Sequence, residues 1–379
     1  MIVGINGFEA VIPRFGYDKN GSPRRVGSSE VCYELLVEFS KIDDKNEYVI
    51  YLPSEPTPDM PKENDRWHYK IVKGDKLWTI FGLTRELLKR PKLDVFFSPT
   101  HYGPLFTPCP EVICLLDVSY KYFPELFNKK DLIQLALWGK YSIKRAARIV
   151  TISDSSKSDI IKEYGLSNDK ISVFHLGVKE SLKPSMSYEK LSEKYSIKKP
   201  YVLFVGTIQP RKNIARLIEA FSQIEDREVN LVIVGRKGWM YDEVLEAPQK
   251  FNLSDRVTFL HDVTDGELPV FYENAELFVL PSLYEGFGLP ILEAMKYGCP
   301  VVTSNVSSLP EAGGNAAVYF DPYDVSDIAK KMEKVLKDKT LRDKMKKEGH
   351  SQVKKFSWEK AASEVLGVFE EIGGQKNGA

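Results

Sequence analysis

Short apolar runs alternate with amphipathic stretches along almost the whole chain, separated by Gly or Pro. Such runs, bounded by turn residues, are typical of strands buried on both faces in parallel sheets that helices cover. The pattern therefore predicts an α/β protein and argues against a sandwich or a bundle. The expected strands are Ile2–Ile5, Tyr48–Leu52, Asp94–Ser98, Val112–Leu116, Ile149–Ile152 and Ile171–Phe174, then Tyr201–Val205, Asn230–Val234, Val257–Leu260, Leu277–Leu280, Pro300–Thr303 and Ala317–Phe320.

A polar, lysine-rich stretch bracketed by prolines, Lys179–Pro200, interrupts this alternation. A chain of 379 residues is long enough for two domains with separate cores. We therefore expect a domain boundary in this stretch. A second α/β pattern begins directly after it, at Tyr201.

The composition indicates which kinds of partner and which cellular compartment to expect. Lys plus Arg and Asp plus Glu both number 53, so no overall field favours nucleic acid or an anionic membrane. The four cysteines lack Cys-x-x-Cys spacing, which predicts reduced, buried thiols. With no leader-like start and no membrane-length apolar run, we expect a cytoplasmic protein. The amphipathic, basic segment Leu77–Arg90 either packs on a core or touches a membrane.

The stretch Pro281–Ser304 has the features of an anion-binding turn. It follows the expected strand Leu277–Leu280, and Gly286 and Gly288 let backbone N–H groups approach a ligand closely. A helix is expected to start near Gly288. Free N–H groups and the positive dipole end of a helix start bind an anion, most usefully a phosphate.

Two carboxylates bracket that helix start. Glu285 lies in the turn before it, and Glu293 lies about two helical turns along. Because phosphate repels carboxylates, the two acids are expected to hold uncharged hydroxyls on either side of it, as in a sugar nucleotide. The alternative is that they are ordinary surface acids, and their spacing alone does not exclude it.

Cations follow the first strand of the second half. Arg211 and Lys212 stand at an expected helix start after Tyr201–Val205. Arg can fork onto an oxyanion while Lys supplies a point charge, so the pair suits a phosphate ligand. Solvated surface charges are the alternative. The segment Gly235–Gly238, with Arg236, repeats the strand-then-glycine arrangement and is expected to line a base or phosphate pocket.

Loops of the first half hold further candidates, because ligands bind outside the carboxyl ends of parallel strands. His101 follows the third expected strand, and Leu116–Asp117 ends the fourth. A lone loop histidine is more often structural than catalytic, and both roles stay open for His101. Gly27, preceded by Arg24–Arg25, either opens an anion-binding helix start or belongs to a flexible basic loop.

Together these segments resemble glycosyltransferase family 4, retaining enzymes with the GT-B fold of two Rossmann-like domains. The likeness covers nearly the whole chain and is strongest in Tyr201–Pro322, through LFVGTIQPRKNIARLIEAF, EGFGLPILEAM and SLPEAGGNAAVYFDP. It implies two doubly wound domains facing each other across a cleft, an acceptor-side domain at 1–180 and a donor domain at 181–357. It also implies that a helix at 358–372 crosses back onto the first domain. The tail from Gly373 is expected to be disordered.

The resemblance also assigns roles to single residues. It implies that Glu285 contacts the transferred sugar, that Glu293 holds the ribose hydroxyls, and that Arg211 and Lys212 neutralise the diphosphate. The expected catalytic residues are Glu285, Lys212, Arg211, Asp117 and His101. The other expected donor-binding positions are Gly27, Thr207, Arg236, Val263, Gly286, Phe287, Gly288 and Leu289.

Two positions depart from the family pattern. Thr207 stands where many members have Arg, and Arg211 is expected to compensate. Leu116 stands where the family usually has a His against the donor sugar, and leucine cannot hydrogen-bond a hydroxyl. Either activity is reduced or another group supplies the contact. His101 is the candidate, because neighbouring strand ends lie about 5 Å apart.

The implied function is transfer of a hexose from a nucleotide-diphosphate sugar, with retention, to a glycan, lipid-linked or small-molecule acceptor. The Arg-Lys-Asn spelling favours mannose from GDP-mannose. No Asp-x-Asp motif ends a strand, so neither a metal nor another cofactor is expected. The alternative is a weak or inactive sugar-nucleotide-binding subunit, and peripheral contact with the inner face of a membrane is a further expectation. A nicotinamide dehydrogenase is disfavoured, since no suitable Gly-x-Gly-x-x-Gly turn follows a strand.

Overall fold

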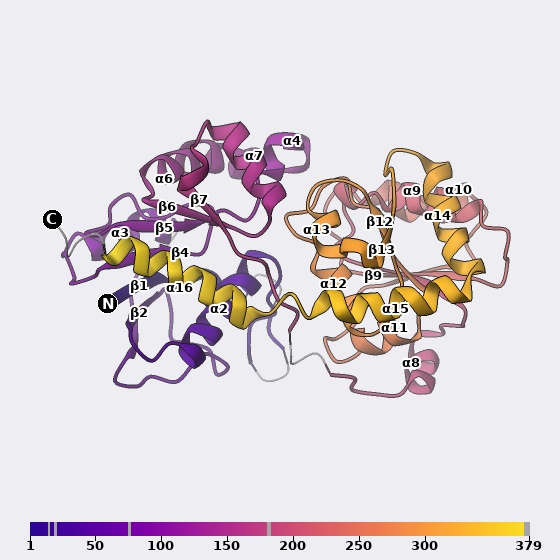
Figure 1. Ribbon diagram of the computed structural model, residues 1–379, viewed down its shortest axis with the longest axis horizontal. Helices are drawn as coiled ribbons and strands as arrows, with labels where there is room; N and C mark the ends of the chain where they lie inside the picture. The colour runs from indigo at the N-terminus through magenta and orange to yellow at the C-terminus, as the bar shows by residue number, and fades with distance from the viewer. Residues whose placement is uncertain (14–15, 19–20, 75–76, 180–182, 375–379) are drawn as a thin grey trace. The chain divides into compact units, whose positions relative to one another are not determined.

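The chain divides into two units in the computed structural model (Figure 1). Unit 1 comprises Met1–Gly177 and Ser357–Ala379, and unit 2 comprises Val178–Phe356. The expected boundaries, 180/181 and 357/358, lie three residues and one residue later in the chain. The structure describes every residue except 14–15, 19–20, 75–76, 180–182 and 375–379. Most of the tail expected to be disordered therefore lies outside the described residues.

Unit 1 contains a seven-stranded parallel sheet in the order β3-β2-β1-β4-β5-β6-β7. Its strands are β1 Ile2–Asn6, β2 Glu47–Leu52, β3 Trp67–Ile71, β4 Val95–Ser98, β5 Glu111–Cys114, β6 Arg148–Thr151 and β7 Ile171–Val173. The sequence predicted six of these and missed β3. This edge strand buries only Trp67, so its polar residues gave no apolar run.

The helices of unit 1 are mostly short. They are α1 Phe8–Val11, α2 Ser28–Ile42, α3 Leu83–Leu87, α4 Ser119–Tyr122, α5 Lys129–Gln134, α6 Lys140–Arg145, α7 Asp154–Tyr164 and α16 Trp358–Gly374, with π-helical turns η1 Trp78–Gly82 and η3 Leu135–Gly139 and 3₁₀ turns η2 Pro124–Leu126 and η4 Asn168–Lys170. One continuous helical segment runs from Lys129 to Arg145, and the π-helical turn η3 lies within it between α5 and α6.

The C-terminal helix α16 packs on the sheet and helices of unit 1 (Figure 1). Phe369 carries this contact, with its ring centroid 5.7 Å from that of Phe39 on α2 and 5.2 Å from that of Phe97 on β4. At the helix start, a Cβ on Gly177 would lie 2.3 Å from the Trp358 backbone nitrogen, so only glycine fits there. The last helix thus belongs to the core of the first unit.

Unit 2 contains a six-stranded parallel sheet in the order β10-β9-β8-β11-β12-β13. Its strands are β8 Tyr201–Val205, β9 Asn230–Val234, β10 Val257–Leu260, β11 Leu277–Leu280, β12 Val301–Ser304 and β13 Ala317–Phe320. Its helices are α8 Tyr188–Tyr195, α9 Ile214–Ser222, α10 Asp242–Lys250, α11 Leu268–Asn274, α12 Leu289–Lys296, α13 Leu309–Gly313, α14 Val325–Lys337 and α15 Lys339–Val353, with 3₁₀ turns η5 Pro210–Lys212 and η6 Gly314–Ala316. All six strands were predicted, with β12 displaced by one residue.

The stretch expected to be a linker contains helix α8. Leu191 is fully buried, and Lys194 and Tyr195 both bond the buried Glu267 carboxylate at the start of α11. Tyr195 also packs on Phe271, with ring centroids 5.7 Å apart. This part of the stretch is thus integral to unit 2 even though its composition is polar.

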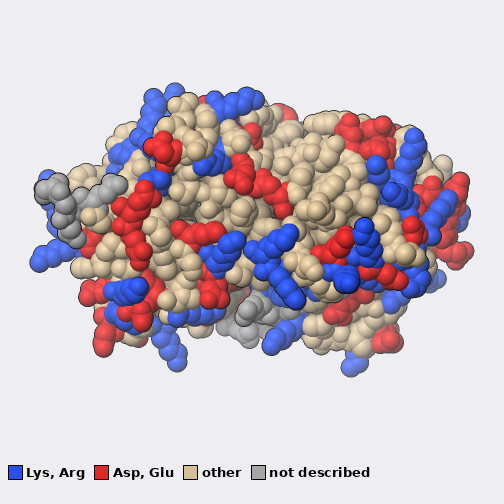
Figure 2. Space-filling model, in the orientation of Figure 1, with Lys and Arg blue, Asp and Glu red and all other residues tan. Residues whose placement is uncertain are grey.

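Each sheet reverses its strand order once, at β1/β4 in unit 1 and at β8/β11 in unit 2. Ligands of such sheets bind outside the carboxyl ends of the strands at that point, which directs attention to the loops after β8 and β11. The four cysteines are buried thiols outside any disulfide, as predicted. Among the described residues, no helix has the length and apolarity to cross a membrane. Charges of both signs intermix on the face shown in Figure 2.

Candidate active site

The turn between β11 and α12 is rigidly built. Gly288, the N-cap of α12, has φ +111°, and a Cβ there would also lie 3.1 Å from Leu309 Cδ2. The Ser308 hydroxyl donates to the carbonyl oxygens of Glu285 (2.8 Å) and Phe287 (2.9 Å). The predicted turn and helix start are therefore present, with the backbone fixed before any ligand arrives.

Glu285 is the centre of the site. Its carboxylate is buried and receives hydrogen bonds from three side chains. Ser282 Oγ donates to Oε1 at 2.6 Å, Lys212 Nζ donates to the same oxygen, and Arg211 donates from one guanidinium nitrogen to Oε2 at 3.2 Å. Burial by itself raises the pKa of Glu285, but Lys212 and Arg211 outweigh it and hold the pKa at about 2. The carboxylate is therefore ionised at neutral pH.

The two cations reach Glu285 because the loop after β8 is bound to the loop after β11. The Arg211 guanidinium donates to the Tyr284 carbonyl, and Leu283 N donates back to the Arg211 carbonyl (2.9 Å). After the 3₁₀ turn η5, Asn213 adopts a left-handed conformation (φ +57°) and donates to the Pro322 carbonyl at 2.8 Å. These bonds fix the backbone that carries both cations.

The sequence predicted these three residues but not their pairing. Arg211 and Lys212 were expected on a diphosphate and Glu285 on a sugar, and the structure brings all three side chains into one ion-paired cluster. Within the described residues, a single guanidinium nitrogen makes both side-chain bonds of Arg211. The Arg211 side chain is 16% exposed.

Glu293 lies on α12 and is partly buried. Its Oε2 accepts a hydrogen bond from the Tyr272 hydroxyl (2.9 Å), and Tyr272 stacks on Tyr297 with ring centroids 6.2 Å apart. Burial raises the pKa of Glu293 although the Tyr272 bond opposes that effect. Tyr272 was missed, because nothing in the sequence relates α11 to α12.

Glycine contacts shape the loops after β8 and β9. A Cβ on Gly235 would lie 1.8 Å from the Gly206 carbonyl oxygen, and one on Gly238 would lie 2.8 Å from the Ile208 carbonyl oxygen. His261 Nδ1 bonds the Gly235 carbonyl at 2.9 Å, so this nitrogen carries the proton. His261 was also missed. The predicted positions Thr207, Arg236 and Val263 lie in the loops after β8, β9 and β10.

The comparisons with known proteins identify the family. Residues 187–352 match the family model described as glycosyl transferases group 1. The O-antigen chain mannosyltransferase B of Escherichia coli is 36% identical over 260 residues, which span 67% of this chain and 68% of that protein. The chain belongs to the group 1 glycosyltransferases.

Other relatives agree with this assignment. An O-antigen chain mannosyltransferase of Salmonella typhimurium is 32% identical over 251 residues, spanning 65% of this chain and 67% of that protein. Among solved structures, Anabaena HepE in complex with UDP-glucose has a TM-score of 0.73, with 98% of this chain and 99% of that one covered at 16% identity. That likeness shows the fold alone. Both units of this glycosyltransferase have the Rossmann-like architecture of the GT-B fold.

In unit 1 of this glycosyltransferase, the loops that carry His101 and Asp117 follow β4 and β5, which are neighbours in the sheet, as expected. β5 is shorter than predicted. It ends at Cys114, and Leu116 lies two residues beyond it, only 7% exposed. Asp117 accepts a hydrogen bond from Ser119 N at 2.8 Å, just where α4 starts. Catalytic roles for His101 and Asp117 stay predictions.

Arg25, two residues before Gly27, has its own partners within unit 1. The Arg25 side chain is only 6% exposed, and one of its guanidinium nitrogens lies 2.5 Å from Asp59 Oδ2. Its Nε donates to the Ala10 carbonyl (2.8 Å), and the guanidinium carbon lies 3.8 Å from the Tyr33 ring centroid. Arg25 is therefore neither an anion ligand nor part of a flexible basic surface. Gly27 itself has φ +58° at the start of α2, and its role toward the donor stays a prediction.

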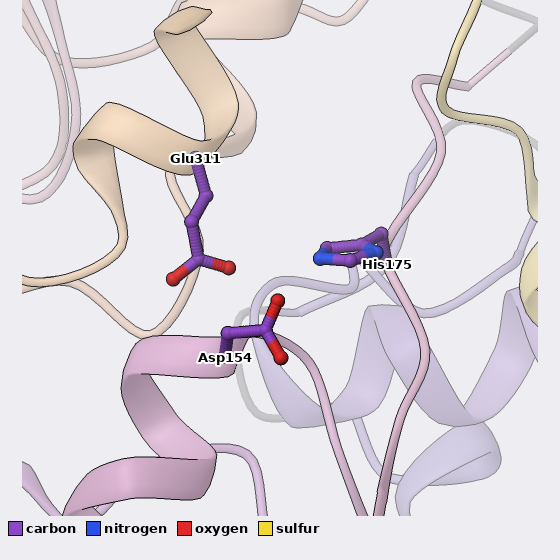
Figure 3. A group of neighbouring side chains, drawn as sticks. All are labelled: Asp154, His175 and Glu311. Atoms are coloured by element: carbon purple, nitrogen blue, oxygen red, sulfur yellow. The ribbon is translucent and has the colours of Figure 1, made fainter.

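A carboxylate and an imidazole of unit 1 were not expected to be neighbours. Figure 3 shows Asp154 at the start of α7 and His175 in the segment after β7, and their candidate ligand atoms lie within 4.8 Å of each other. Glu311, also labelled there, belongs to α13 of unit 2. The signal for the unit 1 pair was present, because both residues directly follow adjacent strands, β6 and β7.

Proposed function

We propose that this glycosyltransferase transfers a hexose, mannose in the first instance, from a nucleoside-diphosphate sugar with retention of anomeric configuration. The names of the Escherichia coli and Salmonella typhimurium relatives support mannose, since both are O-antigen chain mannosyltransferases. The observation that carries the proposal is the buried Glu285 carboxylate between Arg211 and Lys212 at the carboxyl end of the unit 2 sheet. The acceptor is a glycan, a lipid-linked molecule or a small molecule.

The chemistry proposed for this cluster follows from its charges. Breaking the anomeric C–O bond leaves the electron pair on the diphosphate oxygen and positive charge on the sugar. Arg211 and Lys212 stabilise the developing phosphate charge, and one such preorganised donor is worth about 3 kcal/mol. Because Glu285 stays ionised, it stabilises the positive charge of the sugar on the other side. Glu293 holds the ribose hydroxyls.

The two cations serve both the carboxylate and the diphosphate in this mechanism. Arg carries five donors and Lys three, so each can hold Glu285 and a phosphate oxygen together. The fixed positive charge replaces a divalent metal, and we propose that transfer needs neither a metal nor another cofactor. We further propose that the enzyme works in the cytoplasm or at the inner face of a membrane.

One observation favours a second candidate, a sugar-nucleotide-binding subunit with little or no turnover. Leu116 is buried and offers no hydrogen bond to a donor sugar. A thermal-shift screen of nucleotide sugars, followed by transfer and donor-hydrolysis assays with and without EDTA, separates the two. We expect GDP-mannose to stabilise the protein and EDTA to leave transfer unchanged within about twofold. Donor binding without turnover would instead support the second candidate, and a strict Mn²⁺ or Mg²⁺ requirement would contradict metal independence.

A further inference from the structure

Unit 1 exposes large apolar side chains on two helical segments. Phe81 and Leu88, on and just after η1 and α3, are 56% and 58% exposed. Ile133, Leu137 and Tyr141, along α5, η3 and α6, are 60%, 63% and 45% exposed. The last three follow one another at intervals of four residues, so they share one helical face. Side chains of this size are costly to leave in water.

One loop residue joins the two segments. The Leu105 backbone N–H donates to Thr84 Oγ1 of α3 at 2.8 Å, while the Leu105 carbonyl accepts from the Tyr141 hydroxyl of α6 at 3.0 Å. The segments therefore lie on either side of the same loop. We call the five exposed residues, with this loop between them, the apolar surface.

The exposed charges around the apolar surface are almost all positive, although Lys89 pairs with the buried acid Glu86. The exposed charged side chains of 78–90 and 129–145 are Arg85, Lys89, Arg90, Lys129, Lys130, Lys140, Lys144 and one acid, Asp131. This contrasts with the whole chain, in which both signs number 53. Exposed apolar residues flanked by Lys and Arg are the chemistry that binds an anionic lipid surface.

We propose that the apolar surface docks on an anionic phospholipid bilayer, with the apolar side chains among the lipids and the basic ones on the headgroups. A second copy of the chain is a poorer occupant. A twofold interface would set the same basic residues against each other, and like charges facing each other across an interface are costly.

The docking surface bears on the acceptor, and this step rests on the proposed function. The loop bound by α3 and α6 also carries His101, and its Tyr102 hydroxyl accepts from Gln134 on α5 at 2.5 Å. The candidate acceptor-side histidine is thus held next to the lipid-binding helices. Of the three acceptor classes, this favours the lipid-linked one.

Sedimentation of the full chain with vesicles tests the proposal, and needs no donor. We expect binding to phosphatidylglycerol–phosphatidylcholine vesicles at low salt to be at least tenfold stronger than to phosphatidylcholine alone, and to weaken as salt rises. The double variant Phe81→Glu/Leu137→Glu should bind the phosphatidylglycerol-containing vesicles at least tenfold more weakly than the wild type does. Trp239→Glu/Met240→Glu in unit 2, at side chains 44% and 60% exposed, adds the same two charges. It is the matched control and should bind as the wild type does.

A charge-reversal pair separates the two contributions. Lys140→Glu/Lys144→Glu should weaken vesicle binding at least about twentyfold, because each cation near an anionic surface is worth about fivefold. Lys330→Glu/Lys334→Glu on α14 makes the same change in net charge at the same spacing and should have little effect. Thermal melts of all variants check that they fold.

Two results would overturn the proposal. One is the absence of wild-type binding to phosphatidylglycerol vesicles at low salt, or equal binding by the wild type and the folded apolar-surface variants. The other is a dimer, measured by light scattering, that Leu137→Glu dissociates, since the surface would then be covered by a second copy. Vesicle binding without nucleotide-sugar binding would leave the surface standing and remove the proposed function. Nucleotide-sugar binding without vesicle binding would do the reverse.

Discussion

Each unit buries a glutamate beside a cation, and the two pairs behave differently. In unit 1, Glu111 on β5 receives Arg145 and Ser98 Oγ (2.8 Å), and burial raises its pKa to about 7. In unit 2, Glu285 receives Arg211 as well as Lys212, and its pKa falls to about 2. Both carboxylates are almost fully enclosed. Of these two carboxylates, the one with two cationic partners has the lowered pKa and the one with a single arginine has the raised pKa.

The two pairs also differ in the other hydrogen bonds that their arginines make. Arg145 also donates to Thr107 Oγ1 (3.0 Å) and the Pro104 carbonyl (2.7 Å), so its pair holds a loop in place. A Cβ on Gly103 would even collide with Glu111 Oε1, at 1.8 Å. Among the described residues, by contrast, both side-chain bonds of Arg211 come from a single guanidinium nitrogen, and the proposed diphosphate contact would use the others. We therefore assign a structural role to the unit 1 pair, and the proposed catalytic role to the unit 2 pair.

The largest expected effect comes from removing one member of the unit 2 pair. Lys212→Met should lower the free energy of unfolding by about 3–5 kcal/mol at pH 7, because it leaves a buried carboxylate short of a partner. In a double-mutant cycle with Glu285→Gln, the coupling should be about 3 kcal/mol. The same cycle with Arg145→Met and Glu111→Gln should give about 1 kcal/mol, since Glu111 can take up a proton instead. Equal coupling energies in the two cycles, measured by urea unfolding, would contradict the proposed difference between the two pairs.

Catalysis should separate the two carboxylates next. Glu285→Gln should lower turnover by about 100- to 1000-fold, or roughly 3–4 kcal/mol, because the charge facing the sugar is lost. Its affinity for nucleoside diphosphate should stay the same or rise, since the cations no longer share their charge with a carboxylate. Glu111→Gln is the matched control, and its turnover should stay near that of the wild type. Loss of nucleotide affinity in Glu285→Gln would show that the assigned role is wrong.

Stability should respond to pH in opposite directions at the two sites. The folded pKa of Glu285 lies below its ordinary value of 4.5, so its contribution is present above pH 4.5 and lost as pH falls toward 2. The folded pKa of Glu111 lies above 4.5, so its contribution is present below pH 4.5 and lost as pH rises through 7. Each effect is on the order of 3 kcal/mol. Urea unfolding of the two Gln variants against the wild type at pH 3, 5 and 8 should show these trends, and parallel curves would contradict them.

The smallest expected effect concerns the candidate acceptor-side histidine. His101→Ala should lower turnover about tenfold, or roughly 1.4 kcal/mol, within the lower range for a proton-transfer or positioning residue. Nucleotide affinity should not change. Leu116→His in the same background should restore part of the turnover if His101 replaces the family histidine. His68→Ala on the edge strand β3 is the control, and full activity in His101→Ala would end the hypothesis.

The fold could be predicted from the sequence wherever a buried element consists of a recognisable apolar pattern. Strands enclosed on both faces, such as β8, are continuous apolar runs and were predicted to the residue. The edge strand β3 and helix α8 have polar surfaces, so composition pointed to loop and linker.

The site was predictable in its members and not in its contacts. Arg211, Lys212 and Glu285 stand in local motifs, in the loops that follow β8 and β11. Their pairing depends on β8 and β11 being neighbours, which only the topology fixes. Tyr272 beside Glu293, and Arg145 beside Glu111, are likewise long-range contacts without a local signal. Local motifs thus predicted which charged residues belong to the site, whereas their pairing depends on the tertiary structure.

The central claim is that Arg211 and Lys212 bind the diphosphate of the donor. The test uses whichever of GDP or UDP gives the larger thermal shift, and its parent nucleoside as the control ligand. Titration calorimetry measures the binding of both to the wild type, Arg211→Ala and Lys212→Ala. Melts must first show that the variants are folded at the titration temperature. Each substitution should weaken nucleoside diphosphate binding by about 1–3 kcal/mol and leave nucleoside binding unchanged. Unchanged diphosphate affinity in a folded variant, or an equal loss for the nucleoside, would contradict the account.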